Sequence, residues 1–301
     1  MATAEAHLPP GGVVDAHTHA FPPEVVGKRE AYLRRDAWFG LLYAEPRAPL
    51  VMGDEVVAAM DAAGIAQSVL CGFPWRDPGL CREHNDSMAA AARASRGRLA
   101  WLGIVSPAAG SAAAIEAERC FVLGAAGLGE FNADAQGFDL REPAPLAPVV
   151  EVCLAHDRPL MLHASEPIGH AYPGKGTATP DRLLAFLAAF PALRVVLAHW
   201  GGGLPFYELM PEVAAAAARV AYDSAASTYL YRPQVFRAVL DVVGPDRVLF
   251  ASDHPVLRQD RFLRRVLASA ELQTDEAPAV LGGTARRVYG LPSPEPVGNP
   301  G

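Results

Sequence analysis

Lysine is almost missing from this sequence of 301 residues. Of its 26 lysine and arginine residues only Lys28 and Lys175 are lysines, which leaves 24 arginines. The basic residues are scattered along the chain, and the formal net charge is −7. Because nucleic-acid binding relies on clustered cations that contact phosphates, this pattern argues against nucleic acid as a partner.

Cysteines are few, and long apolar runs are absent. The four cysteines form no CxxC pair, so we expect neither a disulfide framework nor a thiolate metal site. No segment approaches the roughly 18 consecutive apolar residues of a membrane span. Residues 1–10 contain no signal-peptide pattern. We therefore expect a cytoplasmic protein without a membrane partner.

The sequence does contain a regular alternation of segments. Eight apolar segments predict β-strands: Val13–His19, Ala66–Phe73, Leu99–Pro107, Ala125–Asn132, Arg158–Ser165, Arg194–Gly201, Val220–Ser227 and Arg247–Pro255. The stretches between them predict helices: Asp54–Ala63, Arg82–Ser95, Ser111–Leu123, Leu146–His156, Asp181–Phe190, Tyr207–Ala218 and Gln234–Val243. Eight such units favour a closed (β/α)8 TIM barrel, which commonly needs about 250 residues, over an open doubly wound sheet.

We expect a single α/β domain over residues 11–291, with flexible termini at residues 1–10 and 292–301, where proline and glycine are frequent. The segment from Pro22 to Met52 is longer than most strand–helix connections. Long connections are often functional, so two hypotheses stand side by side, a lid over the substrate and a packed surface excursion.

Polar side chains stand at the ends of several predicted strands. His17 and His19 end the first strand, His163 the fifth, His199 the sixth and Asp253 the eighth. The strand ends of a barrel converge on the face where its active site lies, and strand alternation points His17 and His19 the same way. Neutral imidazoles with one carboxylate suit a zinc ion that keeps an open position. The sequence therefore predicts a metal site at the C-terminal ends of the strands.

These residues lie in four motifs, VDAHTH at 14–19, PLMLHASE at 159–166, VLAHWGGG at 196–203 and FASDHP at 250–255. In these motifs and their order the chain resembles the amidohydrolase superfamily, in the branch that includes aminocarboxymuconate-semialdehyde decarboxylase. The resemblance implies that His17, His19, His163 and Asp253 hold a metal. It also implies that His199 either acts as an acid or base or binds a second ion.

The fourth predicted strand departs from one common pattern of the superfamily. Many dinuclear members bridge two ions with a carboxylated lysine from this strand, but neither lysine here lies on a predicted strand. Glu130 resembles instead the fourth-strand glutamate that bridges metals in the TatD-type branch. Two hypotheses remain. Glu130 is a ligand, which allows a second ion with His163 and His199, or it does not touch the metal and instead orients a ligand histidine or binds the substrate.

Several further side chains are candidates for contact with the substrate or the ligands. The predicted substrate-binding residues are Glu166, His170, Tyr172 and Lys175, after the fifth strand, and Trp75 and Arg76, after the second. The alternative after the fifth strand is that glycine and proline shape a turn while the polar tips are solvated, and after the second strand that Trp75 and Arg76 are ordinary loop neighbours. Asp15 and Asp223 either hydrogen-bond the site or support neighbouring strands, and alternation points His254 away from the metal.

The main functional prediction is a hydrolase in which a metal-activated water attacks an amide, lactone or ester carbonyl of a small molecule, with Asp253 and His199 as catalytic residues. The alternative is a non-oxidative, metal-dependent decarboxylase of a small carboxylated aromatic or semialdehyde substrate. A barrel that only binds ligands explains the metal set less well. We expect Zn²⁺, as one ion or as two if Glu130 bridges, with Mn²⁺ or Fe²⁺ as alternatives. A homodimer is also considered, because members of this branch often dimerise.

Overall fold

The computed structural model describes residues 8–292, in which strands and helices alternate. The predictions for the terminal residues 1–7 and 293–301 lie outside this range. Eight parallel strands pair in sequence order. They are β1 (Val13–Thr18), β2 (Ile65–Leu70), β3 (Leu99–Gly103), β4 (Gly127–Phe131), β5 (Leu160–Leu162), β6 (Val195–Leu197), β7 (Val220–Asp223) and β8 (Val248–Leu249).

The chain that follows β8 closes the sheet onto β1. The amide of Ala16 donates to the carbonyl of Phe250 at 2.9 Å, and Thr18 and His254 form a parallel bridge. Asp15 adds a side-chain tie, because its carboxylate accepts from Ser252 Oγ at 2.5 Å and from Gln259 Nε2 at 2.8 Å. The predicted (β/α)8 barrel is confirmed, and Asp15 supports its closure.

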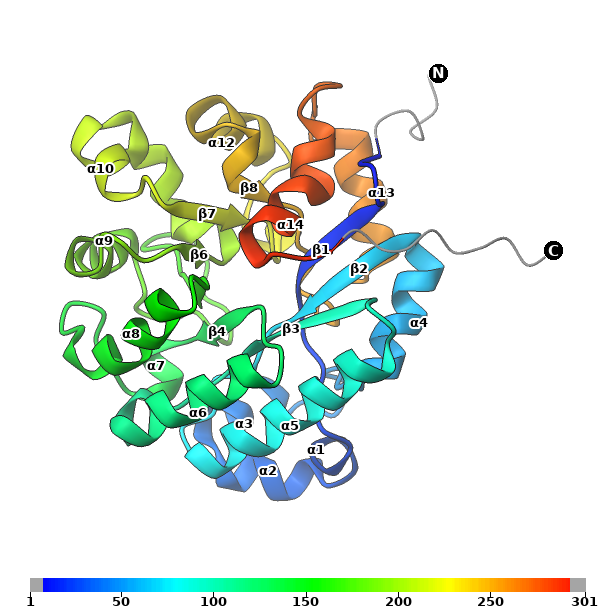
Figure 1. Cartoon of the computed structure of the whole chain (residues 1–301). Helices are drawn as coiled ribbons and strands as arrows, with labels where there is room; N and C mark the ends of the chain where they lie inside the picture. Colours follow the sequence, from blue (N-terminus) through cyan, green and yellow to red (C-terminus); the bar gives the residue numbers. More distant parts are fainter. Residues whose placement is uncertain (1–7, 293–301) are drawn as a thin grey trace.

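Helices surround the strands (Figure 1). Those that follow the strands around the barrel are α4 (Gly53–Ala63), α5 (Pro78–Ala94), α6 (Ser111–Val122), α8 (Ala147–Ala155), α9 (Pro180–Ala189), α10 (Pro211–Ala216), α12 (Val235–Val243), α13 (Gln259–Ser269) and α14 (Thr284–Tyr289). Shorter ones lie in connections: α1 (Pro23–Gly27), α2 (Arg29–Arg35), α3 (Ala37–Tyr43), α7 (Ala133–Gln136) and α11 (Ser227–Leu230). No helix of the described residues has the length and apolarity needed to cross a bilayer.

Two apolar layers hold the barrel together. A large cluster packs the strands against the surrounding helices. A smaller, separate cluster draws buried side chains from every strand or its edge, among them Val69, Leu102, Met161 and Val196, and Tyr289 of α14 joins it. Filling the interior with branched side chains makes the barrel a packed core rather than a pore.

The observed elements differ from the predicted ones mainly at their ends. The predicted eighth strand reaches Pro255, whereas β8 stops at Leu249 and Asp253 lies in the loop beyond it. The helix expected from Tyr207 begins only at Pro211, because a residue that precedes proline is held extended, as Met210 is (φ −91°, ψ 121°). The sequence analysis did not predict α13 and α14.

The long segment from Pro22 to Met52 is a packed excursion that forms α1, α2 and α3. Three of its rings form an aromatic cluster with Phe21, which follows β1, and with two rings that follow β2. The members of the cluster are Phe21, Tyr32, Phe39, Tyr43, Phe73 and Trp75. Phe39 lies at its centre, fully buried, with ring centroids 4.7 Å from Tyr43 and 5.2 Å from Trp75. Burial of this many rings favours a fixed wall over a mobile lid.

Candidate metal centre and cavity

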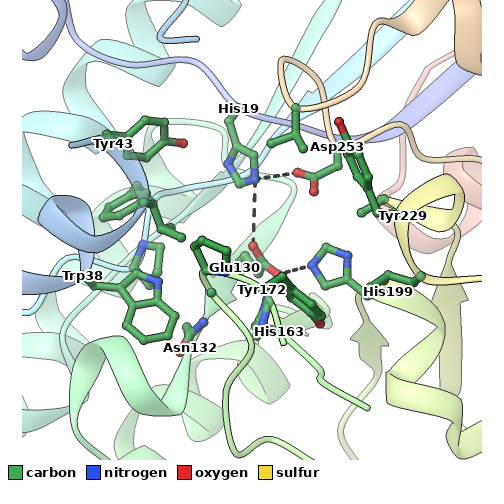
Figure 2. Close-up of a pocket in the computed structure, with 18 of the residues that line it drawn as sticks. His19, Trp38, Tyr43, Glu130, Asn132, His163, Tyr172, His199, Tyr229 and Asp253 are labelled. Carbon is green, nitrogen blue, oxygen red and sulfur yellow. Dashed lines mark hydrogen bonds and ion pairs between the residues drawn. The ribbon is translucent and has the colours of Figure 1, made fainter. Parts of the chain in front are cut away.

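Six polar side chains from five strand ends meet at the C-terminal mouth of the barrel. They are the predicted metal ligands His17, His19, Glu130, His163, His199 and Asp253. Figure 2 shows five of them, all except His17, around one space. The structure thus brings the predicted set together, and we call it the polar floor.

Glu130 lies at the centre of the polar floor. Its Oε1 atom is 2.9 Å from His163 Nδ1 and 3.4 Å from His199 Nε2. Its Oε2 atom is 3.5 Å from His17 Nε2 and 3.9 Å from His19 Nε2. Two groups of three potential ligands therefore share this carboxylate. The arrangement fits one ion near His17 and His19, and it also has room for the bridging role proposed from the sequence.

The outer nitrogen of three floor histidines is held by an acceptor. His17 Nδ1 lies 2.9 Å from Asp223 Oδ2, His19 Nδ1 3.2 Å from the carbonyl of Cys71, and His199 Nδ1 3.2 Å from the carbonyl of Ala225. An N–H at each Nδ1 leaves the lone pair on Nε2, which is the atom that faces the floor. This is how metal-binding histidines are usually oriented, so the residues fit a divalent cation.

Burial and charge shift the protonation of the floor in opposite directions. Burial alone would raise the pKa of Glu130, but the charges of His17 and His163 hold it well below its usual range. Burial would lower the pKa of His199, yet its hydrogen bond to Glu130 and the nearby carboxylates raise it to about 9. The carboxylates and imidazoles of the floor thus stabilise each other's charged forms, and a divalent cation would take the place of the imidazole protons beside the carboxylates.

A run of left-handed backbone positions His199. Residues 199–203 all have positive φ, between 55° and 95°. Glycine adopts this conformation without the Cβ clash that other residues meet, which explains three glycines in succession. A Cβ on Gly202 would also lie 2.3 Å from the carbonyl oxygen of Ser165. The HWGGG motif is therefore a tight turn that presents His199 to the floor.

A cavity of about 340 Å³ lies above the polar floor. Trp38, Leu42, Tyr43 and Phe73 form an apolar wall, and His170, Tyr172 and Tyr229 border the cavity as well (Figure 2). The predicted substrate-binding residues His170 and Tyr172 are thus placed on the cavity. This volume is within the range of small-molecule sites.

Four other predicted substrate-binding residues lie away from this cavity. Trp75 is 1% exposed inside the aromatic cluster, where its indole N–H donates to His84 Nδ1, and Arg76 is exposed at the surface. Glu166 and Lys175 line a neighbouring cavity of about 420 Å³. Lys175 donates to the carbonyls of Ile168 and His170, which closes its own loop. These four side chains are absent from the lining of the cavity above the polar floor, and their contact with a substrate stays a prediction.

Several residues that the structure places at the site had no settled role in the sequence prediction or were not named in it. Asp223, left with two interpretations, orients His17 and also accepts from the amide of His199 at 2.9 Å. Asn132, Trp38 and Tyr43 line the cavity without having been candidates. Asn132 follows Glu130 by two residues, so strand alternation could have identified it. No comparable signal exists for Trp38, which reaches the cavity through the folding of α3.

Known proteins similar to this chain include decarboxylases and a lactonase. The chain is 24% identical to 6-methylsalicylic acid decarboxylase of Penicillium expansum, across 92% of this chain and 95% of that one. It is 31% identical to L-fucono-1,5-lactonase of Burkholderia multivorans, but only across 36% of this chain and 40% of that one.

A solved structure with the same fold is 5-carboxyvanillate decarboxylase of Novosphingobium aromaticivorans, complexed with manganese and 4-hydroxy-3-methoxy-5-nitrobenzoic acid. Its TM-score is 0.76 at 21% identity, with 96% of this chain and 98% of that one covered. The amidohydrolase family model matches residues 14–291, which include every residue of the polar floor. The chain belongs to the amidohydrolase family.

Proposed function

We propose that this protein is a metal-dependent, non-oxidative decarboxylase of a small aromatic carboxylic acid. The observation that carries the proposal is the cavity, whose floor is made of metal-binding groups and whose wall is made of aromatic rings. A flat ring fits against such a wall, and its carboxylate can approach the floor. The sequence alone favoured hydrolysis; the 6-methylsalicylic acid decarboxylase relative, which matches nearly the full length, supports the alternative prediction better.

The proposed metal ligands are His17, His19, His163 and Asp253. Glu130 lies between these histidines, and His199 lies next to Glu130. When bound, a divalent ion supplies Lewis-acid polarisation of a substrate oxygen and offsets the negative charge of the carboxylates. Manganese in the structure of the 5-carboxyvanillate decarboxylase makes Mn²⁺ a stronger candidate than the sequence suggested, and Zn²⁺ is the other ion to test.

The side chains of the floor have to move one proton. In non-oxidative decarboxylation a proton is added to the ring carbon that bears the carboxylate. The carbon–carbon bond then breaks, its electron pair returns to the ring, and CO₂ leaves. His199 and Asp253 both border the cavity, His199 next to Glu130 and Asp253 next to His19 (Figure 2), and are the residues we assign to proton transfer. The apolar wall excludes water from the ring during this step.

The test is release of CO₂ from hydroxylated benzoates by the purified protein loaded with Mn²⁺ or Zn²⁺. We expect His17→Ala to lose most of the bound metal and to lower kcat/KM by at least about a thousandfold. The reason is that the variant lacks one of the side chains that hold and position the ion. His156→Ala is the matched control, since His156 is a half-exposed histidine that pairs with Glu118 outside the barrel mouth. Unchanged metal content and activity in His17→Ala would contradict the proposal.

Lactone hydrolysis is the second function to include in the same assay, because of the partial match to L-fucono-1,5-lactonase. Acid release from lactones is followed by pH indicator alongside the CO₂ measurement. Lactone turnover without any CO₂ release would favour the hydrolase prediction over the decarboxylase proposal.

A further inference from the structure

Asn132 presents an amide group whose orientation is fixed. Its Oδ1 atom accepts hydrogen bonds from the amides of Asp134 and Ala135, both at 3.0 Å, as the N-cap of α7. The backbone amide of Asn132 donates in turn to Gln136 Oε1 at 3.3 Å. Because an amide oxygen must face these two N–H donors, the Nδ2 group has to point the other way.

The Nδ2 group of Asn132 points into the cavity. The side chain is 3% exposed, borders the cavity and turns its nitrogen toward the space between Trp38 and His163 in Figure 2. Among the described residues this nitrogen has no hydrogen-bond partner. The nitrogen opens onto the cavity, where a water or a ligand oxygen can accept from it. The site therefore holds a ready neutral donor beside the polar floor.

The cavity also contains no arginine or lysine among the described residues that line it. Arg76 lies at the surface, and Lys175 is bonded to its own loop. Two carboxylates, Glu130 and Asp253, already face the cavity. A substrate carboxylate at the floor is attracted by the ion, but a second carboxylate higher in the cavity would meet Trp38, Leu42 and Asn132 with no opposite charge.

We infer that the substrate is a monocarboxylic aromatic acid whose second polar group is an uncharged oxygen, and that Asn132 Nδ2 donates to that oxygen. This inference rests on the proposed function and narrows its substrate class. A hydroxyl on the ring satisfies the free donor, whereas a second carboxylate would be buried without a cation, which is strongly unfavourable. Asn132 is in this view a specificity-determining residue rather than one that takes part in proton transfer.

The test is calorimetric binding of three ligands to the metal-loaded enzyme: benzoate, 3-hydroxybenzoate together with its ring isomers, and benzene-1,3-dicarboxylate. We expect at least one hydroxybenzoate to bind about tenfold more tightly than benzoate, the order of one net hydrogen bond. The dicarboxylate should bind at least about tenfold more weakly than benzoate, because its second charge is desolvated without a partner.

Two variants separate recognition by Asn132 from its structural role. Asn132→Ser keeps an N-cap oxygen for α7 but removes the NH2 group that faces the cavity. Asn132→Asp keeps the N-cap oxygen and replaces that hydrogen-bond donor by an acceptor. Both should retain the metal content and melting temperature and lose the preference for hydroxybenzoate over benzoate. Equal weakening of both ligands in the two variants, or a dicarboxylate that binds as tightly as benzoate, would overturn the inference.

The same protein samples distinguish this inference from the proposed function. If CO₂ is released from dicarboxylated and monocarboxylated rings alike, the decarboxylase proposal stands and the substrate class is wrong. If hydroxybenzoates bind with the expected preference but no acid releases CO₂, the recognition by Asn132 stands and the reaction is wrong.

Discussion

Two loops border the same cavity and are held in opposite ways. The first loop, residues 19–52 between β1 and α4, is fixed by the buried rings of the aromatic cluster, with Phe39 at its centre. The fifth loop, residues 163–179 between β5 and α9, is exposed or half-buried except at Ala164, Ser165 and Ala178. Its own hydrogen bonds hold it, from Lys175 to two carbonyls and from the Tyr172 hydroxyl to Glu166 at 3.0 Å.

The difference indicates a division of tasks around the cavity. Ring packing removes large apolar areas from water and cannot be rearranged without a cavity in the core. Hydrogen bonds at a surface exchange readily with water and contribute little net stability. We therefore expect the first loop to act as a fixed wall and the fifth loop as the adjustable side that lets substrate enter.

The largest expected effect comes from a pair of truncations, one in each loop. Phe39→Ala removes a fully buried ring and should lower the free energy of unfolding by about 3–5 kcal/mol. Ile168→Ala removes a side chain that is 79% exposed and should change it by less than about 0.5 kcal/mol. Urea denaturation followed by circular dichroism measures both, and similar losses in the two variants would remove the contrast between the loops.

The next effect is the pH dependence of stability caused by His84, which contacts Trp75 of the aromatic cluster. His84 accepts from the Trp75 indole at 2.9 Å, and burial lowers its pKa to about 3. The unfolded chain takes up this proton below about pH 6.5 while the folded protein does not, so stability falls as the pH decreases from about 6.5 toward 3. At pH 5 the loss relative to pH 7 should be about 2 kcal/mol.

His84→Gln is the variant that isolates this contribution, because glutamine offers the indole an acceptor but does not titrate. We expect its unfolding free energy to depend less on pH between 7 and 5 than that of the wild type. His156→Gln, at a half-exposed histidine, serves as the control and should keep the wild-type dependence. Parallel pH profiles for His84→Gln and the wild type would show that His84 is not the cause.

The smallest effect is expected in the fifth loop. Lys175→Met removes the hydrogen bonds to the carbonyls of Ile168 and His170, at 2.7 and 3.1 Å. Each such bond contributes about 1 kcal/mol or less at an exposed site, so KM should rise roughly three- to tenfold while the melting temperature changes little. Lys28→Met is the matched control, since Lys28 is the other lysine and pairs with Glu24 at the surface. A large fall in melting temperature for Lys175→Met alone would mean that the fifth loop is structural.

The two loops also show where sequence analysis succeeds and where it stops. Hydrophobic periodicity predicted the eight strands, and the position of His163 and His199 at strand ends predicted that both lie on one face of the barrel. The same analysis could not tell that Trp75 faces the aromatic cluster and His170 the cavity, because both simply follow a strand. Only the packing of α3 against the loop that follows β2 decides which rings are covered.

The sequence by itself determined the order of the barrel strands and the meeting of His17, His19, His163, His199 and Asp253 at one face, because both follow from short-range periodicity and from the parallel geometry of the sheet. Glu130 was added to this set only by the family resemblance, with its role left open. The tertiary structure decided which atoms of those side chains face one another. Glu130 between two histidine pairs, Asp223 behind His17 and the free amide nitrogen of Asn132 all depend on contacts between residues far apart in the chain or on local turns, and such contacts leave no periodic pattern in the sequence.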